Sequence, residues 1–528
     1  MGKGQAGEAL KVYEQGLAAE PGNVACQKGI AAVPDAAEAP GGPDPRPANP
    51  TPASARSHAK ENIAELLPPF QLLPVPGLAA GVQKAPYLKS LAELVVGPIE
   101  TAIVSNYMMD VDLLFRAFPA LKNVKRDVVL LHGETELRSD LHGSREFKVS
   151  VFKPETEHYG THHTKMFLLF YSSGVRVIVH TANLLTGDLY RKVQGVWHQD
   201  FPLKASEHWA SSDFEAGLAR YVRGLKLPRT LKRTDGSSTQ IDLVAMVRRF
   251  DFSTARAKLI TSVPGRQRGL KKTPERHLNG HMAVRRALEG EDFSEAASAA
   301  LWLVMQPTSL GSMKNPKVYK AIVQSFCAGL NCEAWPRIVW PTAREVLDST
   351  EGKDAGKSIP ATKANVDLLR TAIPFHRFRG ATTPAKAAMP HIKTYARYDA
   401  ASRRVAWCMV GSHNLSGAAW GVLEKDDSQL YIRSFELSVL MLPSLELQYL
   451  KGGRTFDAPS GRWRRTSPAL PSGVERVQFR HLGAARAGDG GGSTEPKTHI
   501  VDLPLPYPLP DARNVYRPEE GAWHLQLL

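Results

Sequence analysis

The chain has 528 residues, with 67 Lys and Arg against 52 Asp and Glu and a formal net charge of +15 at pH 7. Hydrophobic residues make up 43% and charged residues 23%, which is typical of a folded protein and too apolar for general disorder. No apolar run approaches the ~18–20 residues of a membrane span, and we expect no secretory signal because the first thirty residues lack an apolar core. Four cysteines without C-x-x-C spacing predict neither a disulfide framework nor a zinc clip, so we expect a protein of a reducing compartment without membrane association.

The first sixty residues hold six basic and six acidic side chains, so the whole net charge belongs to residues 61–528. Apolar residues recur at helical spacing in Gly7–Gly29, which resembles half of a tetratricopeptide repeat. Such a half-repeat cannot bury its own face. Seven prolines lie among small residues from Pro34 to Pro52, which is the composition of a linker. We therefore expect residues 1–61 to form a disordered or linker tail with one possible helical half-repeat.

From residue 62 onward, strand-like and helix-like segments alternate, which predicts α/β layers. Asp110–Phe118 is helix-like, and the strand-like runs are Ala102–Tyr107, Val128–Leu131, Lys165–Tyr171 and Val175–His180. The basic junction Arg248–Lys258 is the best place to divide this part, giving expected domains at 62–250 and 251–528. A Gly-Asp-Gly-Gly-Gly run within Ala485–Pro496 predicts a mobile surface loop.

Positive charge is concentrated between Tyr221 and Arg276, where fourteen Lys and Arg face four Asp and Glu. The stretch includes the pairs Arg248-Arg249 and Lys271-Lys272. Such clusters are most often solvated loops, and they also form phosphate-facing rims or nuclear import signals. The basic balance favours a polyanionic partner.

One pattern occurs twice in the chain. Each copy has His-x-Lys at the start of a strand, a turn, a return strand and Asn-Leu at its far end. The first copy contains His163, Lys165 and Asn183, and the second contains His391, Lys393 and Asn414. A lone His-x-Lys is close to chance in a chain with 17 histidines, whereas a doubled pattern with matched strands is not.

The geometry of a strand gives this pattern a chemical meaning. Side chains at i and i+2 share one face, so each copy places an imidazole beside an ammonium group. The antiparallel return strand can bring the Asn amide alongside them. Two such sets facing each other would form a cationic pocket for one tetrahedral anion, which favours phosphoryl transfer.

The doubled pattern resembles the phospholipase D superfamily. Because the Asp that usually follows His-x-Lys is missing, the chain is similar to the tyrosyl-DNA phosphodiesterase family, specifically the type that acts on 3′ ends. Matching motifs run through nearly all of residues 62–528, among them Thr161-His-His-Thr-Lys-Met, Gln306-Pro-Thr-Ser-Leu-Gly-Ser and Asn414-Leu-Ser. The resemblance implies an α/β fold of two similar α-β-α layered domains related by pseudo-two-fold symmetry.

The resemblance also implies roles for the repeated residues. His163 would attack the phosphorus and form a covalent phosphohistidine. His391 would protonate the leaving tyrosine oxygen and then act as base for the hydrolytic water. The two lysines and the two asparagines would hold the non-bridging oxygens. Glu436 would orient His163 and Gln194 would orient His391 in a crossed arrangement. Without the resemblance, the sequence would favour ordinary surface positions for both residues.

For DNA contacts, the resemblance points to Tyr159, which could stack on a base or pack as a strand-end aromatic. Contacts to backbone phosphates would come from Ser309, Ser312 and Ser416. Gly417 departs from the family, which commonly has Lys at this position. We expect no metal and no cofactor, because two ammonium groups already supply positive charge. We expect His162, His180 and His413 to be structural, Trp523 to lie in the core, and Cys327 and Cys332 to be unpaired thiols.

The leading hypothesis is a nuclear, monomeric DNA-repair phosphodiesterase that hydrolyses the 3′-phosphotyrosyl bond left by stalled topoisomerase I, as well as other 3′ blocking groups. Its DNA substrate would be single-stranded or nicked, with a tyrosyl peptide at the 3′ end. One alternative is a phospholipase or general nuclease of the same superfamily. Another is a DNA-binding scaffold whose catalytic site has decayed.

Overall fold

The structure is a computed structural model that describes residues 63–65, 67–75, 87–134, 137, 148–205, 211–272, 276–293, 301–312, 315–330, 335–379, 388–467, 470–482 and 498–528. The predicted helical half-repeat, the proline-rich linker and the glycine-rich loop lie outside these residues. Among the described residues, no helix has both the length and the apolar character needed to cross a lipid bilayer.

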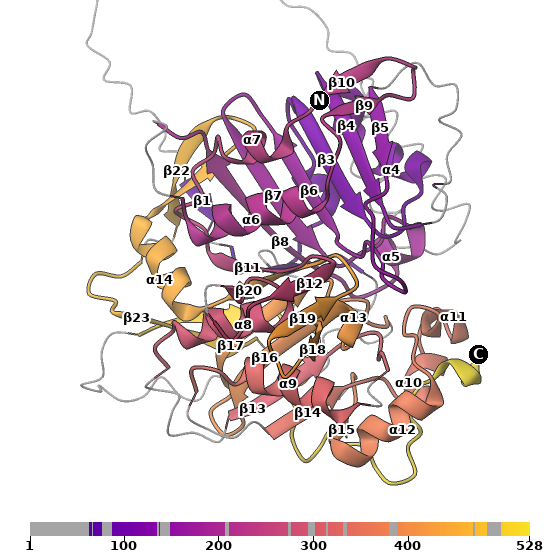
Figure 1. Ribbon diagram of the computed structural model, residues 1–528. Coiled ribbons are helices and arrows are strands. Elements are labelled where there is room, and N and C mark those ends of the chain that lie inside the picture. Colours follow the sequence, from indigo (N-terminus) through magenta and orange to yellow (C-terminus); the bar gives the residue numbers. More distant parts are fainter. Residues whose placement is uncertain are drawn as a thin grey trace, which may run out of the picture. The chain divides into compact units, whose positions relative to one another are not determined.

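A seven-stranded sheet in the order β2-β8-β7-β6-β3-β4-β5 forms the first half of the fold (Figure 1). Its strands are β2 (Gln71–Leu72), β3 (Thr101–Asn106), β4 (Asp127–His132), β5 (Val149–Phe152), β6 (Met166–Phe170), β7 (Gly174–His180) and β8 (Gly195–Pro202). The accompanying elements are α3 (Leu91–Leu94), α4 (Val111–Ala117), η1 (Pro119–Asn123), α5 (Thr186–Tyr190), α6 (Asp213–Gly224), α7 (Leu243–Val247) and the hairpin β9 (Thr230–Lys232) and β10 (Ser238–Gln240). All four predicted strands and the predicted helix are present to within one or two residues.

Alternating side chains of this sheet supply two separate cores. Ile103 of β3 and Leu168 of β6 face a core shared with α6. Their neighbours Val104 and Phe167 face the other core, shared with α3 and α4. Because both faces are covered by helices, the strands read as nearly continuous apolar runs rather than as an alternating pattern.

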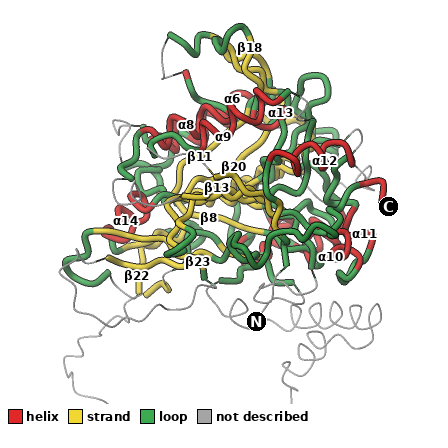
Figure 2. The backbone as a smooth tube through the Cα atoms, turned by 90° about the horizontal axis from the view of Figure 1, so that it is seen from below, coloured by secondary structure: helices red, strands yellow, loops and turns green. Residues whose placement is uncertain are grey.

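The second half contains a nine-stranded sheet whose main path is β11-β20-β17-β16-β13-β14-β15. Its strands are β11 (Ala257–Ser262), β13 (Leu301–Gln306), β14 (Trp335–Val339), β15 (Phe375–His376), β16 (Lys393–Asp399), β17 (Arg404–Gly411), β20 (Glu436–Met441), β23 (Arg476–His481) and β24 (Thr498–Leu503). Its helices are α8 (Gly280–Glu289), α9 (Pro316–Phe326), α10 (Ala343–Leu347), α11 (Lys353–Gly356), α12 (Lys363–Ala372), α13 (Gly417–Trp420), α14 (Pro443–Gly452) and η3 (Leu525–Leu527). Figure 2 shows α6, α8 and α9 on one side of the central strands.

The two sheets repeat one topology. In the first sheet, β3, β4 and β5 pair in parallel, and β3, β6, β7 and β8 pair antiparallel in turn. In the second sheet, β13, β14 and β15 pair in parallel, and β13, β16, β17 and β20 pair antiparallel. Each sheet ends in one more antiparallel strand: β2 pairs with β8 in the first sheet, and β11 pairs with β20 in the second. This correspondence is the pseudo-two-fold relation expected from the repeated motif, and it makes β6 equivalent to β16 and β8 equivalent to β20.

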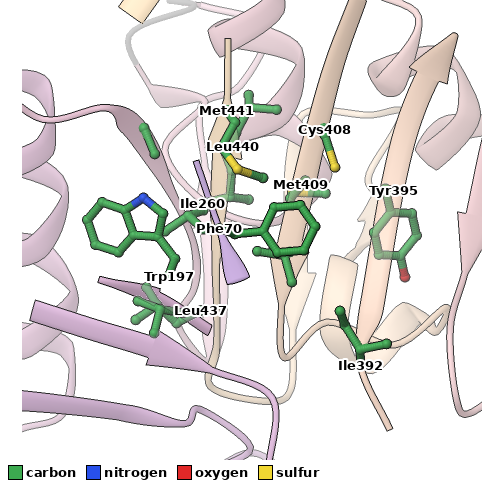
Figure 3. Close-up of a cluster of buried hydrophobic side chains, with 14 of the residues drawn as sticks. Phe70, Trp197, Ile260, Ile392, Tyr395, Cys408, Met409, Leu437, Leu440 and Met441 are labelled. Carbon is green, nitrogen blue, oxygen red and sulfur yellow. The ribbon is translucent and has the colours of Figure 1, made fainter. Parts of the chain in front are cut away.

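The sheets meet through an apolar core that continues from one half to the other. Figure 3 shows Trp197 of β8 and Phe70 close to Ile260 of β11 and Leu437 of β20. At Gly195 a Cβ atom would lie 2.7 Å from Ile392 Cδ1, so this glycine allows the close approach of the halves. Residues 61–528 form one compact unit.

The segment after α14 returns to the first half. Strands β21 (Arg454–Asp457) and β22 (Arg462–Ser467) form a small sheet with β1 (Ile63–Glu65). Phe456 and Ala458 belong to the core that also contains α3 and α4. A further small sheet joins β12 (Gly265–Arg268), β19 (Gln429–Ile432) and β18 (Val422–Glu424). The domain boundary between residues 250 and 251 stays a prediction. The two large sheets are built from residues before and after this point, but residues 454–458, from the second half of the sequence, pack against the first half.

Candidate active site

The fold brings both histidines of the repeated pattern to the junction of the two sheets. His163 lies three residues before β6, and its backbone N–H donates to the Phe435 carbonyl oxygen at 2.9 Å. His391 lies two residues before β16, and its backbone N–H donates to the Val193 carbonyl oxygen at 2.9 Å. Each histidine is therefore held by a backbone carbonyl of the opposite half. The carbonyl that holds His163 belongs to the residue just before Glu436, and the carbonyl that holds His391 belongs to the residue just before Gln194.

The ring of His163 is fixed by two acceptors. Its Nδ1 lies 2.9 Å from Glu436 Oε2 and 3.0 Å from the Ser412 carbonyl oxygen. Neither acceptor can donate a proton, so Nδ1 carries the ring proton in neutral His163 and the Nε2 lone pair is free. The Ser412 hydroxyl donates to the same Glu436 oxygen and fixes the carboxylate in turn.

The ring of His391 faces an amide instead. Gln194 Nε2 lies 3.2 Å from His391 Nδ1, and it also donates to the Asp188 carbonyl oxygen at 3.1 Å. The Thr181 hydroxyl donates to Gln194 Oε1 at 2.7 Å. The predicted crossed contacts are thus present in the structure, with Glu436 from the second half on His163 and Gln194 from the first half on His391.

The two lysines are buried, and each points back to its own histidine. Lys165 Nζ donates to the His163 carbonyl oxygen at 2.9 Å, and Lys393 Nζ donates to the His391 carbonyl oxygen at 2.6 Å. An ammonium group has three donors, so each lysine keeps two for a ligand. Burial lowers the pKa of Lys165 to about 8 and holds the pKa of Lys393 well below its ordinary value.

The two asparagines close the set. Asn414 Oδ1 accepts from the backbone N–H groups of Thr308 and Ser309 at 3.0 and 2.9 Å. This leaves the Asn414 amide N–H groups to donate elsewhere. Asn183 is buried, and its Oδ1 has no hydrogen-bond partner among the described residues.

Burial dominates the electrostatics of the site. It lowers the pKa of His163, which Glu436 opposes, and it lowers the pKa of His391 well below the ordinary value, helped by Lys393 and Lys165. Burial alone would raise the pKa of Glu436, but the neighbouring His163 reverses the shift and the net pKa is lowered. The site therefore holds an ionised carboxylate, neutral imidazoles and cations with little water around them, and this arrangement favours a bound anion.

Comparisons with known proteins agree with this geometry. The sequence profile of the family described as tyrosyl-DNA phosphodiesterase matches residues 69–513. Tyrosyl-DNA phosphodiesterase 1 of Arabidopsis thaliana is 34% identical over 481 residues, which cover 88% of this chain and 76% of the plant protein. The chain belongs to the tyrosyl-DNA phosphodiesterase family.

Other relatives are more distant. Tyrosyl-DNA phosphodiesterase 1 of Drosophila melanogaster is 28% identical over 410 residues, covering 73% of this chain and 66% of the fly protein. The crystal structure of the yeast tyrosyl-DNA phosphodiesterase superposes with a TM-score of 0.56 at 15% identity, covering 86% of this chain and 99% of the yeast chain. At that identity the structural match establishes the fold, which is the phospholipase D-like α/β fold predicted from the sequence.

Among the predicted DNA contacts of this family member, Tyr159 has the most unusual conformation. Its side chain is 80% exposed and its backbone lies in the left-handed region with φ of 60°. A non-glycine residue held there costs about 1–3 kcal/mol, and such residues cluster at functional sites. The next residue must be glycine, because a Cβ at Gly160 would lie 1.9 Å from the Arg433 carbonyl oxygen. The ring contacts the neighbouring His158 ring, with centroids 3.9 Å apart, but it stays presented to solvent and does not join the core, which removes the alternative of a packed strand-end aromatic.

The three predicted serine contacts lie near Asn414. The Ser309 N–H donates to Asn414, Ser312 is exposed, and the Ser416 hydroxyl caps α13 by accepting from the Ala419 N–H. At Gly417 a Cβ would lie 2.8 Å from Val422 Cγ2, so the position where the family commonly has Lys is closed by a packed valine here.

The neighbouring histidines and Trp523 lie in the interior, as expected. His413 bonds to Ser262 and Ser438, and His162 bonds to Ser105. His180 is buried and stacks on Phe167 at 5.3 Å between ring centroids. Trp523 is fully buried. The Cys327 sulfur accepts a hydrogen bond from Arg397 Nη1 at 3.3 Å, and Cys332 lies outside the described residues.

Several residues around the site were not candidates from the sequence. Lys192 follows Asp188 by four residues, with Lys192 Nζ 3.4 Å from Asp188 Oδ1 and 3.5 Å from Glu351 Oε1. Tyr221 of α6 donates its hydroxyl to Thr164 Oγ1 at 2.7 Å, and Thr164 lies between His163 and Lys165 in the sequence. The i, i+4 spacing of Asp188 and Lys192, soon after Asn183, was the available signal for an ion pair facing the site.

The basic stretch found in the sequence forms one wall of a surface groove of about 1080 Å³ between α6 and α7. Among the described residues that line it, four cations have no acidic partner within ion-pair distance: Arg223, Lys226, Arg248 and Arg249. Two further cations are paired within the groove, Lys204 with Glu215 and Arg229 with Asp242. The uncompensated charge makes the groove a candidate binding surface for a polyanion.

Proposed function

We propose that this protein hydrolyses the phosphodiester bond between a DNA 3′ end and a tyrosine side chain, such as the bond left by a stalled topoisomerase I. Family membership supports the activity and the DNA substrate. The observation that carries the mechanism is the hydrogen bonding of His163, whose Nδ1 faces two acceptors and whose Nε2 is therefore an unprotonated nucleophile.

The first step forms a bond from His163 Nε2 to phosphorus. As the bond from phosphorus to the tyrosine oxygen breaks, His391 Nε2 donates a proton to that oxygen, and the tyrosyl peptide leaves. Glu436 stabilises the positive charge that develops on the His163 ring. The product of this step is a DNA 3′-phosphate linked covalently to His163.

The second step releases the DNA. His391, now neutral, takes a proton from a water molecule that attacks phosphorus, and the bond to His163 Nε2 breaks. In both steps, the ammonium groups of Lys165 and Lys393 and the amides of Asn183 and Asn414 hold the non-bridging oxygens. Preorganised donors in a buried site are the largest expected contribution to the rate. The end product is a DNA 3′-phosphate and a free tyrosyl peptide.

The experiment that tests the activity is cleavage of a 3′-phosphotyrosyl oligonucleotide in the presence of EDTA. We expect full turnover by the purified protein and loss of turnover in His163→Ala. Turnover that stops in EDTA would contradict the metal-independent mechanism. Faster turnover of phosphatidylcholine or of unmodified DNA would favour a phospholipase or general nuclease, and salt-dependent DNA binding without any turnover would favour a decayed scaffold.

We also propose that the basic groove guides the DNA backbone. Helix α6 supports a DNA path from the groove to the site. It carries Arg223, which lines the groove, and Tyr221, which donates a hydrogen bond to Thr164 beside His163. Reversing Arg248 and Arg249 to Glu should weaken DNA binding and reduce the slope of log affinity against log salt by about 1 per lost phosphate contact. Lys122→Glu combined with Lys451→Glu, two exposed cations outside the groove, is the matched control. Equal losses in both double variants would contradict the assignment.

Nuclear location and a monomeric state are further proposals. The runs Arg248-Arg249 and Lys271-Lys272 support nuclear import. A fluorescent fusion that stays outside the nucleus would contradict the first proposal. A dimer mass in light scattering would contradict the second.

A further inference from the structure

The carboxylate of Asp188 lies beside His391, and one of its oxygens forms an ion pair with Lys192 but makes no hydrogen bond among the described residues. Asp188 of α5 is buried, and its Oδ1 is 3.9 Å from His391 Nδ1 and 3.4 Å from Lys192 Nζ. This oxygen has no hydrogen-bond partner among the described residues. Buried acceptors nearly always make a hydrogen bond, so this oxygen, which is ion-paired with Lys192 and faces His391, is placed to accept an N–H.

The orientation of the Gln194 amide decides which form of His391 it can bind. The Gly195 N–H donates to Thr181 Oγ1 at 2.9 Å, so the Thr181 hydroxyl proton is free to donate to Gln194 Oε1 at 2.7 Å. Gln194 Nε2 is then the atom that faces His391 Nδ1, at 3.2 Å. An amide N–H can only donate, so this contact suits His391 with an unprotonated Nδ1.

The proposed chemistry needs the other form. When His391 gives its Nε2 proton to the tyrosine oxygen, an unprotonated Nδ1 would leave an anionic imidazolate. The general acid must therefore be the imidazolium, which carries protons on both ring nitrogens. Its Nδ1–H cannot donate to an amide N–H, whereas Asp188 Oδ1 is only about 1 Å beyond hydrogen-bond distance.

We propose that Asp188 is a positioning residue for catalysis, whose carboxylate accepts the Nδ1–H of protonated His391. This inference rests on the proposed function. Gln194 then holds the resting, neutral ring, and Asp188 holds the acid form. After the Nε2 proton moves to the tyrosine oxygen, the ring is neutral with its remaining proton on Nδ1 facing Asp188, and the Nε2 lone pair can accept a proton from water.

The surrounding charges show why a carboxylate is needed there. Burial, Lys393, Lys165, His163 and Lys192 all lower the pKa of His391. A bound phosphodiester opposes these groups from the substrate side, and Asp188 opposes them from the Nδ1 side. An opposite charge at ~4–6 Å typically shifts a pKa by about 1–3 units, so loss of Asp188 should reduce the protonated fraction at least about tenfold.

The test compares two leaving groups in single-turnover reactions with the full-length protein. Asp188→Asn keeps the shape and removes the charge. We expect its cleavage of a 3′-phosphotyrosyl oligonucleotide to slow by at least about tenfold. Cleavage of the 3′-p-nitrophenyl phosphate analogue should slow by no more than about threefold, since that more acidic phenol leaves with little protonation. Equal losses on both substrates would indicate a merely structural role, and unchanged rates on both would exclude any role; either result overturns the proposal.

Lys192→Gln is the companion variant, and its expected effect on the pKa of His391 is opposite to that of Asp188→Asn. Removing this cation should raise the pKa of His391, so the high-pH limb of phosphotyrosyl cleavage should move to higher pH. A limb that stays in place or moves to lower pH would contradict the proposal even if Asp188→Asn failed to fold. If the wild-type protein cleaved neither substrate, the proposed function itself would fail, which is a different result from equal losses in the variant.

Discussion

Replacing Glu436 by Gln isolates the part of catalysis that depends on the charge beside the nucleophile. The carboxylate is buried and accepts the His163 Nδ1–H at 2.9 Å, and the Ser412 carbonyl oxygen accepts the same proton at 3.0 Å. In Glu436→Gln the carbonyl still selects the tautomer with a free Nε2. The variant therefore loses the stabilisation of positive charge on the ring and keeps a correctly oriented nucleophile.

The magnitude follows from the hydrogen bond. A hydrogen bond to a charged group contributes about 1.5–3 kcal/mol, and about 1.4 kcal/mol corresponds to a tenfold change in rate. We therefore expect adduct formation to slow by about 10- to 150-fold. Because Glu436 raises the pKa of His163, its removal lowers that pKa. The low-pH limb of the rate profile, where protonation of His163 removes the nucleophilic lone pair, should then move to lower pH.

The assay is single-turnover cleavage of a 3′-phosphotyrosyl oligonucleotide across pH. Glu446→Gln is the matched control, because Glu446 is equally buried but pairs with Arg256, away from the site. Breaking that pair should cost about 3–5 kcal/mol of stability and leave the rate of the folded protein unchanged. An unchanged rate in Glu436→Gln, or a loss as complete as that of His163→Ala, would contradict this role of the Glu436 charge.

Three further outcomes test the surroundings of the site. Tyr221→Phe removes the donor to Thr164 and leaves the buried Thr164 hydroxyl without this partner, so the free energy of unfolding should fall by about 1–3 kcal/mol in denaturant titrations; an unchanged midpoint would contradict this. Gly417→Lys should lower the melting temperature because its Cβ overlaps Val422, and any gain in DNA affinity without that loss would show that the valine moves freely. Burial lowers the pKa of His281 to about 3. Its neutral form therefore stabilises the fold fully above pH ~6.5, and stability should fall below that pH at up to about 1.4 kcal/mol per pH unit for this group; flat stability from pH 7 to 5 would contradict the shift.

The features of the fold and the site that could be predicted from the sequence were those marked by a local pattern of apolar residues or by a repeated motif. Buried strands such as β4 and β6 contain uninterrupted apolar runs, and the doubled His-x-Lys placed equivalent strands in each half. The contacts that sequence reasoning missed join segments far apart in the chain. Glu351 reaches Lys192 across 159 positions, and Tyr221 reaches Thr164 across 57. Neither contact has a spacing rule, because both depend on how helices pack on sheets.

The role of Asp188 shows a second kind of limit. Its residue type is ordinary, and its side chain matters because the fold buries it beside His391 with one oxygen that makes no hydrogen bond among the described residues. A sequence reports that a carboxylate is present but not whether water surrounds it. The same holds for Gly417, where the departure from the family was visible in the sequence and its packing against Val422 was not.

Trapping the covalent intermediate is the decisive test of the two-step mechanism through His163. In His391→Asn the first step can proceed slowly, but the second step lacks its base, so DNA should accumulate on the protein. The measurement is a denaturing gel of this variant with a 3′-phosphotyrosyl oligonucleotide, followed by mass spectrometry of the adducted peptide. The two-step mechanism predicts a DNA phosphate on His163. An adduct on a different residue, or rapid product release with no adduct, would contradict it.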